Sequence, residues 1–155
     1  MKVSDILRVK GDALHTTEAD RKVFKAVRNM TELDLGSMLV TEGETMVGIL
    51  TFREILLELV KAKGQLGQTL VRDVMDPEPL TCSPDTDIDE VRRMMLARHA
   101  RYMPVLEGGK LLGVVSFYDV AKAVVDSQNL ENKLLKAYIR DWPDEAAQVK
   151  PAQAP

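Results

Sequence analysis

Cysteine is almost absent from this chain of 155 residues, in which Cys82 is the single example. One thiol cannot form an internal disulfide, and a chain without disulfides fits a reducing compartment. Long apolar runs are also absent, because none approaches the ~18 residues of a membrane-spanning helix. The first five residues, MKVSD, do not resemble a signal peptide. We therefore expect a cytoplasmic protein without membrane insertion.

An excess of basic residues is missing as well. The chain has 21 Lys and Arg against 24 Asp and Glu, which gives a formal net charge of −3. A nucleic-acid-binding protein needs a basic face for the phosphate backbone, so we expect no nucleic-acid partner. Motifs of phosphate loops, zinc proteases, paired cysteines and nucleophile elbows are missing too. His15 and His99 lack an evident partner for metal or triad chemistry. The sequence predicts no catalytic residue, no metal site and no enzymatic activity.

What the chain does contain is one internal repeat. Residues 47–55, VGILTFREI, match residues 112–120, LGVVSFYDV, at an offset of 65. Near the start the offset is 68, where residues 3–7 match residues 71–75, so the first copy carries three extra residues around positions 8–14. Two copies of so long a unit predict a duplicated small domain with two related sites, not a solenoid. Each half alone would be marginal, so we expect the halves to share one core.

Each copy predicts the element order β-α-β-β-α. Apolar residues at helical spacing follow Asp20 and Asp87, and apolar strands flank glycine-containing turns near residues 43 and 108. The predicted extended segments are 14–17, 37–41, 46–50, 80–83, 102–106 and 110–115, and the predicted later helices are 52–63, 117–126 and about 128–140. We expect an α+β fold in which the two repeats pack as a pseudo-twofold pair, with an added C-terminal helix. The expected divisions are repeat 1 at 1–63, a linker at 64–70, repeat 2 at 71–127, the C-terminal helix at 128–142 and a disordered tail at 143–155.

The junction between the last strand and the last helix of each copy repeats a hydroxyl and a carboxylate. The pairs are Thr51 with Glu54 and Ser116 with Asp119. One interpretation is a capping box, in which each side chain satisfies an amide at the helix start. The other is a nucleotide site, because helix amides suit a phosphate and a carboxylate can accept from two ribose hydroxyls. The glycine three residues before each hydroxyl would allow close approach to the strand. The spacing alone leaves both interpretations open.

These motifs occur twice in the chain and in the same order each time. Together they resemble a tandem pair of cystathionine-β-synthase (CBS) domains, also called a Bateman module. The resemblance covers residues 3–126 and depends on the element order, on Thr81-x-x-Pro84, on residues 101–105 (RYMPV) and on residues 113–119 (GVVSFYD). The chain looks like the stand-alone bacterial members. The resemblance implies a regulatory module that binds an adenine nucleotide such as AMP, ATP or NAD between the repeats and modulates an unknown partner protein.

The resemblance also implies the residues of two ligand sites, in which the hydroxyl contacts phosphate and the carboxylate holds the ribose. One site would combine Ser116 and Asp119 with His15, Thr16, Ser37 and Met38. The other would combine Thr51, Arg53 and Glu54 with Leu80, Thr81, Arg101, Tyr102 and Met103.

The first copy departs from the family pattern at three positions. Glu54 replaces the usual Asp, and Ala19 and Leu39 stand where the second copy has proline. The longer Glu54 side chain can overshoot the ribose or close a capping box, so its site is in question, although Arg53 and Arg101 could attract phosphate. The site of Asp119 matches the family better. The alternative function is a ligand-free CBS pair that acts as a structural or protein-interaction module.

The apolar residues of two expected helices indicate an interaction surface. The segments 52–63 and 117–126 have apolar residues on more than one face, whereas one stripe suffices to cover a sheet. A C2 homodimer would bury the surplus, and CBS pairs commonly form such dimers. The alternative is a monomer whose extra face is covered by the C-terminal helix.

Overall fold

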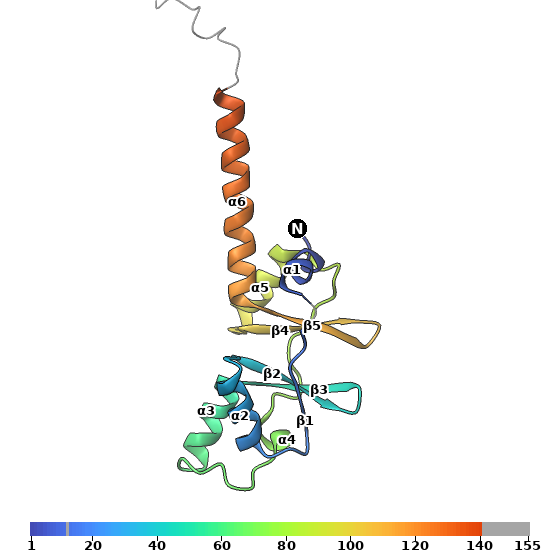
Figure 1. Cartoon of the computed structure of the whole chain (residues 1–155), viewed down its shortest axis with the longest axis vertical. Helices are drawn as coiled ribbons and strands as arrows, with labels where there is room; N and C mark the ends of the chain where they lie inside the picture. The colour runs from blue at the N-terminus through green and yellow to red at the C-terminus, as the bar shows by residue number, and fades with distance from the viewer. Residues whose placement is uncertain (12, 141–155) are drawn as a thin grey trace, which may run out of the picture. The chain divides into compact units, whose positions relative to one another are not determined.

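The structure is a computed structural model that describes residues 1–11 and 13–140. It divides into two units, Met1–Val120 and the chain from Ala121 onward. The first unit contains short helices and two strand hairpins (Figure 1). The elements are α1 Val3–Lys10, β1 Thr16–Glu18, α2 Val23–Glu32, β2 Ser37–Glu42, β3 Thr45–Thr51, α3 Phe52–Lys61, α4 Val71–Val74, α5 Ile88–Arg98, β4 Tyr102–Glu107, β5 Lys110–Ser116 and α6 Phe117–Arg140.

The strands form two small sheets that keep the duplication. In repeat 1, β1 pairs parallel with β2, and β2 pairs antiparallel with β3. In repeat 2, β4 pairs antiparallel with β5. Both hairpins shift register at the equivalent place, between Val40 and Thr41 and between Val105 and Leu106. The two repeats therefore share a local irregularity as well as an element order.

The first strand of repeat 2 is shorter than predicted. Within segment 80–83, Cys82 alone makes a bridge, parallel to Val105, and its amide donates to the Pro104 carbonyl oxygen at 3.0 Å. Pro79 and Pro84 flank this segment, and proline cannot donate to a β-ladder. The predicted order β-α-β-β-α is thus complete in repeat 1, and repeat 2 replaces its first strand by a single bridge.

The predicted division between a helix at 117–126 and a second helix at about 128–140 is wrong. Phe117–Arg140 is one continuous helix, α6, of 24 residues. No glycine or proline lies between 126 and 129 to end it, which explains the continuity. The C-terminal helix is therefore an extension of the last helix of repeat 2. Residues 141–142 of that predicted helix and the predicted tail at 143–155 lie outside the described residues.

The opening segments of the two repeats are exchanged. The helix α1 belongs to repeat 1 by sequence but contacts β5, and the Val3 amide donates to the Thr86 carbonyl oxygen at 3.0 Å. The helix α4 opens repeat 2 but contacts α2, α3 and β3, and the Val71 amide donates to the Arg21 carbonyl oxygen at 2.8 Å. Neither helix was predicted from the sequence. This exchange ties the repeats together.

The core reflects the exchange. Val71 of α4 is fully buried in a cluster with eight residues of repeat 1. Those residues are Ala19, Val23, Ala26, Met30, Met38, Val40, Leu50 and Ile55. On the other repeat, the Val3 side chain of α1 is equally buried. The two repeats therefore bury apolar surface together, as expected from their size.

The extra residues of the first copy lengthen its opening helix. The helix α1 has eight residues and α4 has four. After α4, the chain at Asp76 forms a bridge with Ile49, in which each amide donates to the other's carbonyl oxygen at 2.9 Å. The corresponding stretch after Leu7 instead continues as helix to Lys10. The extra turn brings Lys10 to the strand position where the other repeat has a main-chain bridge.

Matched substitutions at the two strand glycines test this packing. A Cβ on Gly48 would lie 2.6 Å from the Asp76 carbonyl oxygen, a main-chain atom that the bridge to Ile49 holds. A Cβ on Gly113 would lie 2.9 Å from Cδ2 of Leu7, the mobile end of a side chain. We expect Gly48→Ala to lower the free energy of unfolding by roughly 1–3 kcal/mol and Gly113→Ala by less than about 1 kcal/mol. Urea denaturation measures both, and equal losses would contradict the packing.

Candidate functional site

A cleft of about 810 Å³ lies beside the start of α3. It is lined by residues from both repeats, namely Ile49, Thr51, Phe52, Arg53, Glu54, Leu56, Leu57, Val60, Asp76, Glu78, Pro79, Leu80, Arg98, His99, Ala100, Arg101 and Tyr102. Six of these were predicted for one site, namely Thr51, Arg53, Glu54, Leu80, Arg101 and Tyr102. The structure therefore brings together most of the predicted Glu54 site, including members from sequence positions far apart.

The start of α3 contributes polar groups to the lining of the cleft. The Thr51 side chain is the N-cap and accepts from the Arg53 amide at 3.3 Å. The Thr51 hydroxyl donates to Oε2 of Glu54. The Glu54 carboxylate thus contacts the cap hydroxyl, whereas a capping box would join it to the Thr51 main-chain amide. Thr51 and Glu54 are both half-buried, and both line the cleft.

Three arginines give the cleft its capacity for anions. Arg53, Arg98 and Arg101 all line it, and all three residues are exposed. A guanidinium group matches the geometry of a phosphate and can bind it through two parallel hydrogen bonds. Glu54, Asp76 and Glu78 are the acidic members of the same lining. The cleft therefore offers separate groups for an anion and for hydroxyl donors.

Sequence reasoning predicted Arg53 and Arg101 of this cationic group and missed Arg98, which lies three residues before Arg101. The helix α5 ends at Arg98, because His99 is its C-cap in the left-handed conformation, with φ 51° and ψ 32°. The chain then turns into β4, and residues 98–102 all line the cleft. The spacing of Arg98 and Arg101 across a helix end was the available signal.

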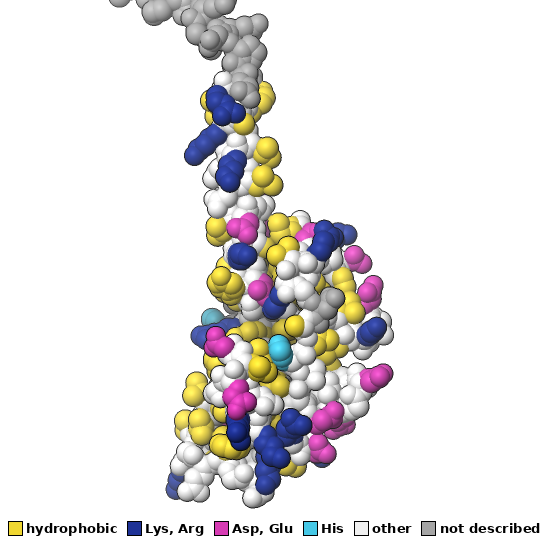
Figure 2. Space-filling model, viewed as in Figure 1, with side chains coloured by type: hydrophobic (Ala, Val, Ile, Leu, Met, Phe, Trp, Pro, Cys, Tyr) yellow, Lys and Arg dark blue, Asp and Glu magenta, His cyan; other side chains and the backbone are white. Residues whose placement is uncertain are grey.

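Apolar walls complete the cleft. Four apolar side chains of α3 line the cleft and are 53–81% exposed, namely Phe52, Leu56, Leu57 and Val60. Hydrophobic side chains gather over α3 at the lower left of the space-filling view (Figure 2). On the opposite repeat, Tyr102 also lines the cleft. Apolar and aromatic walls with a few polar groups are typical of small-molecule sites, which usually measure about 300–1,000 Å³.

Tyr102 occupies its place because Gly36 has no side chain. A Cβ on Gly36 would lie 1.7 Å from the Tyr102 hydroxyl oxygen. Gly36 belongs to repeat 1 and Tyr102 to repeat 2, so this contact joins the repeats beside the cleft. Tyr102 can present its ring to a planar ligand.

Two predicted site residues have their side chains in the core. Met38 is 3% exposed and Met103 is fully buried. They occupy equivalent positions in β2 and β4, so duplication places both inward. A ligand could contact these residues through main-chain atoms. Thr81, by contrast, is exposed next to the bridge at Cys82.

The remaining predicted residues lie on repeat 1. Thr16 pairs with Leu39 in the parallel ladder, and Ser37 pairs with Thr51 in the antiparallel one. The carbonyl oxygen of His15 accepts from the Leu39 amide at 3.1 Å, and the residue is exposed. These residues were predicted to accompany Ser116 and Asp119.

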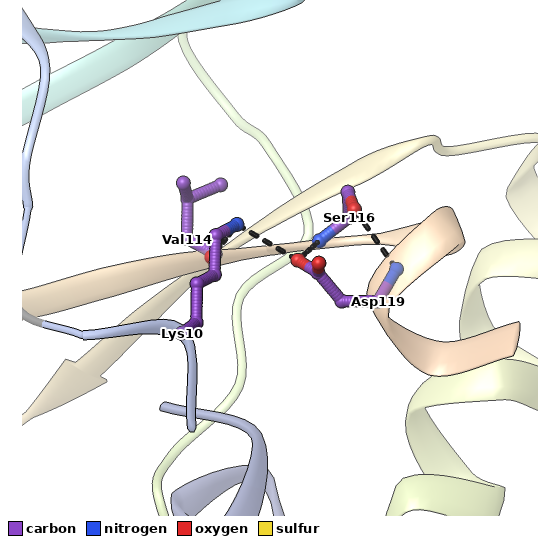
Figure 3. Close-up of polar contacts among 4 residues, drawn as sticks. All are labelled: Lys10, Val114, Ser116 and Asp119. Carbon is purple, nitrogen blue, oxygen red and sulfur yellow. Dashed lines mark hydrogen bonds and ion pairs between the residues drawn. The ribbon is translucent and has the colours of Figure 1, made fainter. Parts of the chain in front are cut away.

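At the second junction the capping-box interpretation is confirmed. The Asp119 amide donates to the Ser116 hydroxyl oxygen at 3.0 Å, and the Ser116 amide donates to Oδ2 of Asp119 at 2.9 Å. The same carboxylate oxygen accepts from Nζ of Lys10 at 2.7 Å, and Lys10 also donates to the Val114 carbonyl oxygen at 3.0 Å (Figure 3). Lys10 was not among the predicted site residues.

The surroundings of Asp119 set its charge. Burial would raise the pKa of this carboxyl group, but hydrogen bonds from Lys10 and Ser116 and the charge of Lys10 outweigh it, so the pKa lies below its ordinary value. Asp119 is therefore ionised in the folded protein at neutral pH.

This shift predicts a pH dependence. A carboxyl group whose pKa is lowered on folding stabilises the protein above its unfolded pKa of about 3.9. The contribution disappears as the pH falls through the lower pKa of the folded state. We expect Lys10→Met to be less stable than the original chain at pH 7, and the difference to shrink below about pH 4 as Asp119 protonates. Urea denaturation at several pH values measures it, and a difference independent of pH would show that Lys10 stabilises by packing alone.

The part of the chain at residues 1–11 and 13–140 has no three His, Cys, Asp or Glu side chains grouped to hold a metal ion. None of its helices combines the length and apolarity needed to cross a membrane. Burial raises the pKa of the Cys82 thiol to about 11, so the thiolate is scarce at neutral pH.

Known proteins are similar to this chain in sequence and in fold. A family model described as "CBS domain" matches residues 3–61 and 71–126. The chain is 29% identical over 147 residues to "CBS domain-containing protein CBSX3, mitochondrial" of Arabidopsis thaliana, covering 89% of this chain and 71% of that protein. The crystal structure of the CBS-domain containing protein ATU1752 from Agrobacterium tumefaciens superposes with a TM-score of 0.75 at 27% identity, covering 79% of this chain and 98% of that one. The crystal structure of CBSX2 in complex with AMP superposes with a TM-score of 0.68 at 25% identity, covering 82% and 98%.

Proposed function

The chain belongs to the CBS domain family, and from this premise we propose that it is a regulatory module that binds an adenine nucleotide in the cleft beside Thr51 and Glu54. The observation that carries the proposal is the convergence of six predicted ligand residues from both repeats on one cleft. The AMP complex of the similar CBSX2 chain supports the ligand class. Binding between the repeats would bias their packing, and a partner protein would detect the change.

We assign the ligand's parts by chemistry. The guanidinium groups of Arg53 and Arg101 would bind phosphate, with help from the amides at the start of α3. The Glu54 carboxylate would accept from ribose hydroxyls, exchanging the Thr51 hydroxyl for those of the sugar. The ring of Tyr102 would stack on the adenine ring. In this proposal the protein binds the nucleotide and does not transform it.

We also propose a homodimer. An apolar stripe runs along α3 at positions i, i+4, i+5 and i+8, which are Phe52, Leu56, Leu57 and Val60. The Val60 side chain is 81% exposed. A stripe of this kind is apolar surface that a monomer rarely leaves open. A second copy related by a twofold axis would cover it. We also propose a reducing, cytoplasmic location, which is supported by the single cysteine, the buried Cys82.

The alternative, a ligand-free interaction module, has one observation in its favour. The carboxylate that matches the family motif best, Asp119, is already used by the capping box and by Lys10. If Glu54 were likewise only a capping residue, the fold would serve contacts between proteins.

Mass spectrometry of small molecules released from the purified native protein separates the two functions. The proposal predicts that an adenine nucleotide accompanies the original chain and is depleted from an Arg101→Ala variant purified in parallel. If no nucleotide is released and none added at millimolar concentration raises the melting temperature, the interaction module is the better account.

A further inference from the structure

We propose that Lys10 is a built-in occupant of the Ser116–Asp119 site, and that it keeps the second nucleotide site of this chain closed. The inference rests on the proposed function and adds to it the number of ligands that each chain takes. It starts from the difference between the two copies of the duplicated site.

The first step is the strand that borders each site. Ile49 of β3 and Val114 of β5 are equivalent positions in the repeat. In repeat 1 the Ile49 carbonyl oxygen accepts from the Asp76 amide at 2.9 Å. In repeat 2 the Val114 carbonyl oxygen accepts from Nζ of Lys10 at 3.0 Å. The ammonium group thus takes the place that a main-chain amide has in the other copy.

The second step is the carboxylate. Glu54 shares the cleft wall with three arginines and contacts its own cap hydroxyl. Asp119 has Oδ2 filled by the Ser116 amide and by Nζ of Lys10, at 2.9 and 2.7 Å. A ribose hydroxyl that took the place of Lys10 at Oδ2 would exchange a charged donor for a neutral one, and hydrogen bonds with charged partners are the stronger ones. The lysine is therefore a competitor for the place of the sugar.

The third step is burial. The Lys10 and Asp119 side chains are 37% and 18% exposed. Exposed ion pairs of the same unit, such as Lys2 with Asp85 at 3.8 Å, join side chains that are 59% and 82% exposed. Screening by water and salt is weaker for the partly buried pair, so it holds its geometry better.

The fourth step is the length of the helix that carries Lys10. The extra residues of the first copy let α1 run to Lys10, while α4 stops at Val74. The helix α1 is fixed on β5, where Cδ2 of Leu7 lies against Gly113. The position of α1 therefore places Lys10 beside Asp119. The close approach that Gly113 allows is taken up by the Leu7 side chain of α1.

Counting AMP molecules per chain tests the inference, by native mass spectrometry together with calorimetric titration. We expect one AMP on the original chain and two on Lys10→Met, with affinity at the opened site raised at least about tenfold, as for one charge-assisted hydrogen bond. Lys2→Met, which removes an exposed ammonium at the opposite end of the same helix, should bind one. Adding Asp119→Ala to Lys10→Met should return the count to one. Lys10→Gln serves as a second uncharged variant if the methionine variant melts early.

Each outcome has a distinct meaning. Two AMP molecules on the original chain, or one on both it and Lys10→Met, would overturn the inference. No AMP on the original chain and one on Lys10→Met would uphold the role of Lys10 and refute the function proposed for the Glu54 cleft. No binding to either chain would refute both.

Discussion

An Arg101→Ala variant is expected to bind AMP at least about tenfold more weakly than the original chain, because hydrogen bonds to charged groups contribute about 1.5–3 kcal/mol each. Arg101 lies on the cleft wall with Arg53 and Arg98, in the group that we assign to phosphate. The guanidinium is exposed, so its removal leaves no buried group unpaired. The variant should fold normally and lose affinity for the anion.

Calorimetric titration measures this loss, and thermal unfolding provides a second readout. A ligand at 100 times its dissociation constant stabilises the folded state by about 2.7 kcal/mol, and a tenfold weaker ligand at the same concentration gives about half of that. The matched control is Arg92→Ala, which also removes one positive charge but from an arginine that pairs with Asp89 on α5 at 3.4 Å. Equal weakening by both variants would mean that overall charge attracts the nucleotide, and that Arg101 has no special part.

A Val60→Glu variant is expected to convert the proposed dimer into a monomer. Val60 is 81% exposed on α3 and lies at the end of the apolar stripe. Two copies related by a twofold axis would place two new carboxylates in one apolar interface, where unpaired charge is strongly disfavoured. Sedimentation should show the original chain at about twice 17.3 kDa and the variant near 17.3 kDa.

Val9→Glu is the matched control for this test. Val9 is also 81% exposed but lies on α1, outside the stripe. It should leave the dimer intact. A single-chain mass for the original protein at tens of micromolar would reject the dimer, and dissociation by both variants would locate the interface elsewhere.

The order of the elements followed from the sequence because both copies obey the same local rules. Apolar spacing and glycine turns are short-range signals, and duplication supplied each signal twice. The members of the Glu54 cleft could be anticipated through the family resemblance, since Thr51 and Arg101 belong to motifs. What escaped prediction depends on chain segments that meet across long distances. The exchange of α1 and α4 between the repeats has no local signature.

Lys10 shows this limit most clearly. It meets Asp119, 109 positions along the chain, only because α1 is one turn longer than α4 and packs on the opposite repeat. The three extra residues were visible in the sequence, but their effect on the second site was not. By its match to the family pattern, the sequence favoured the Asp119 site and put the Glu54 site in question. The geometry supports the reverse proposal, because Glu54 lies on a cleft and Asp119 holds a lysine.

The central claim is that an adenine nucleotide binds beside Thr51 and Glu54, and an NMR titration of the ¹⁵N-labelled chain with AMP tests it most directly. The account predicts saturable shifts of the amide signals of residues 51–54 and 98–102, with smaller changes at residues 114–119. It would be contradicted by the absence of any shift up to millimolar AMP, or by shifts confined to residues 114–119.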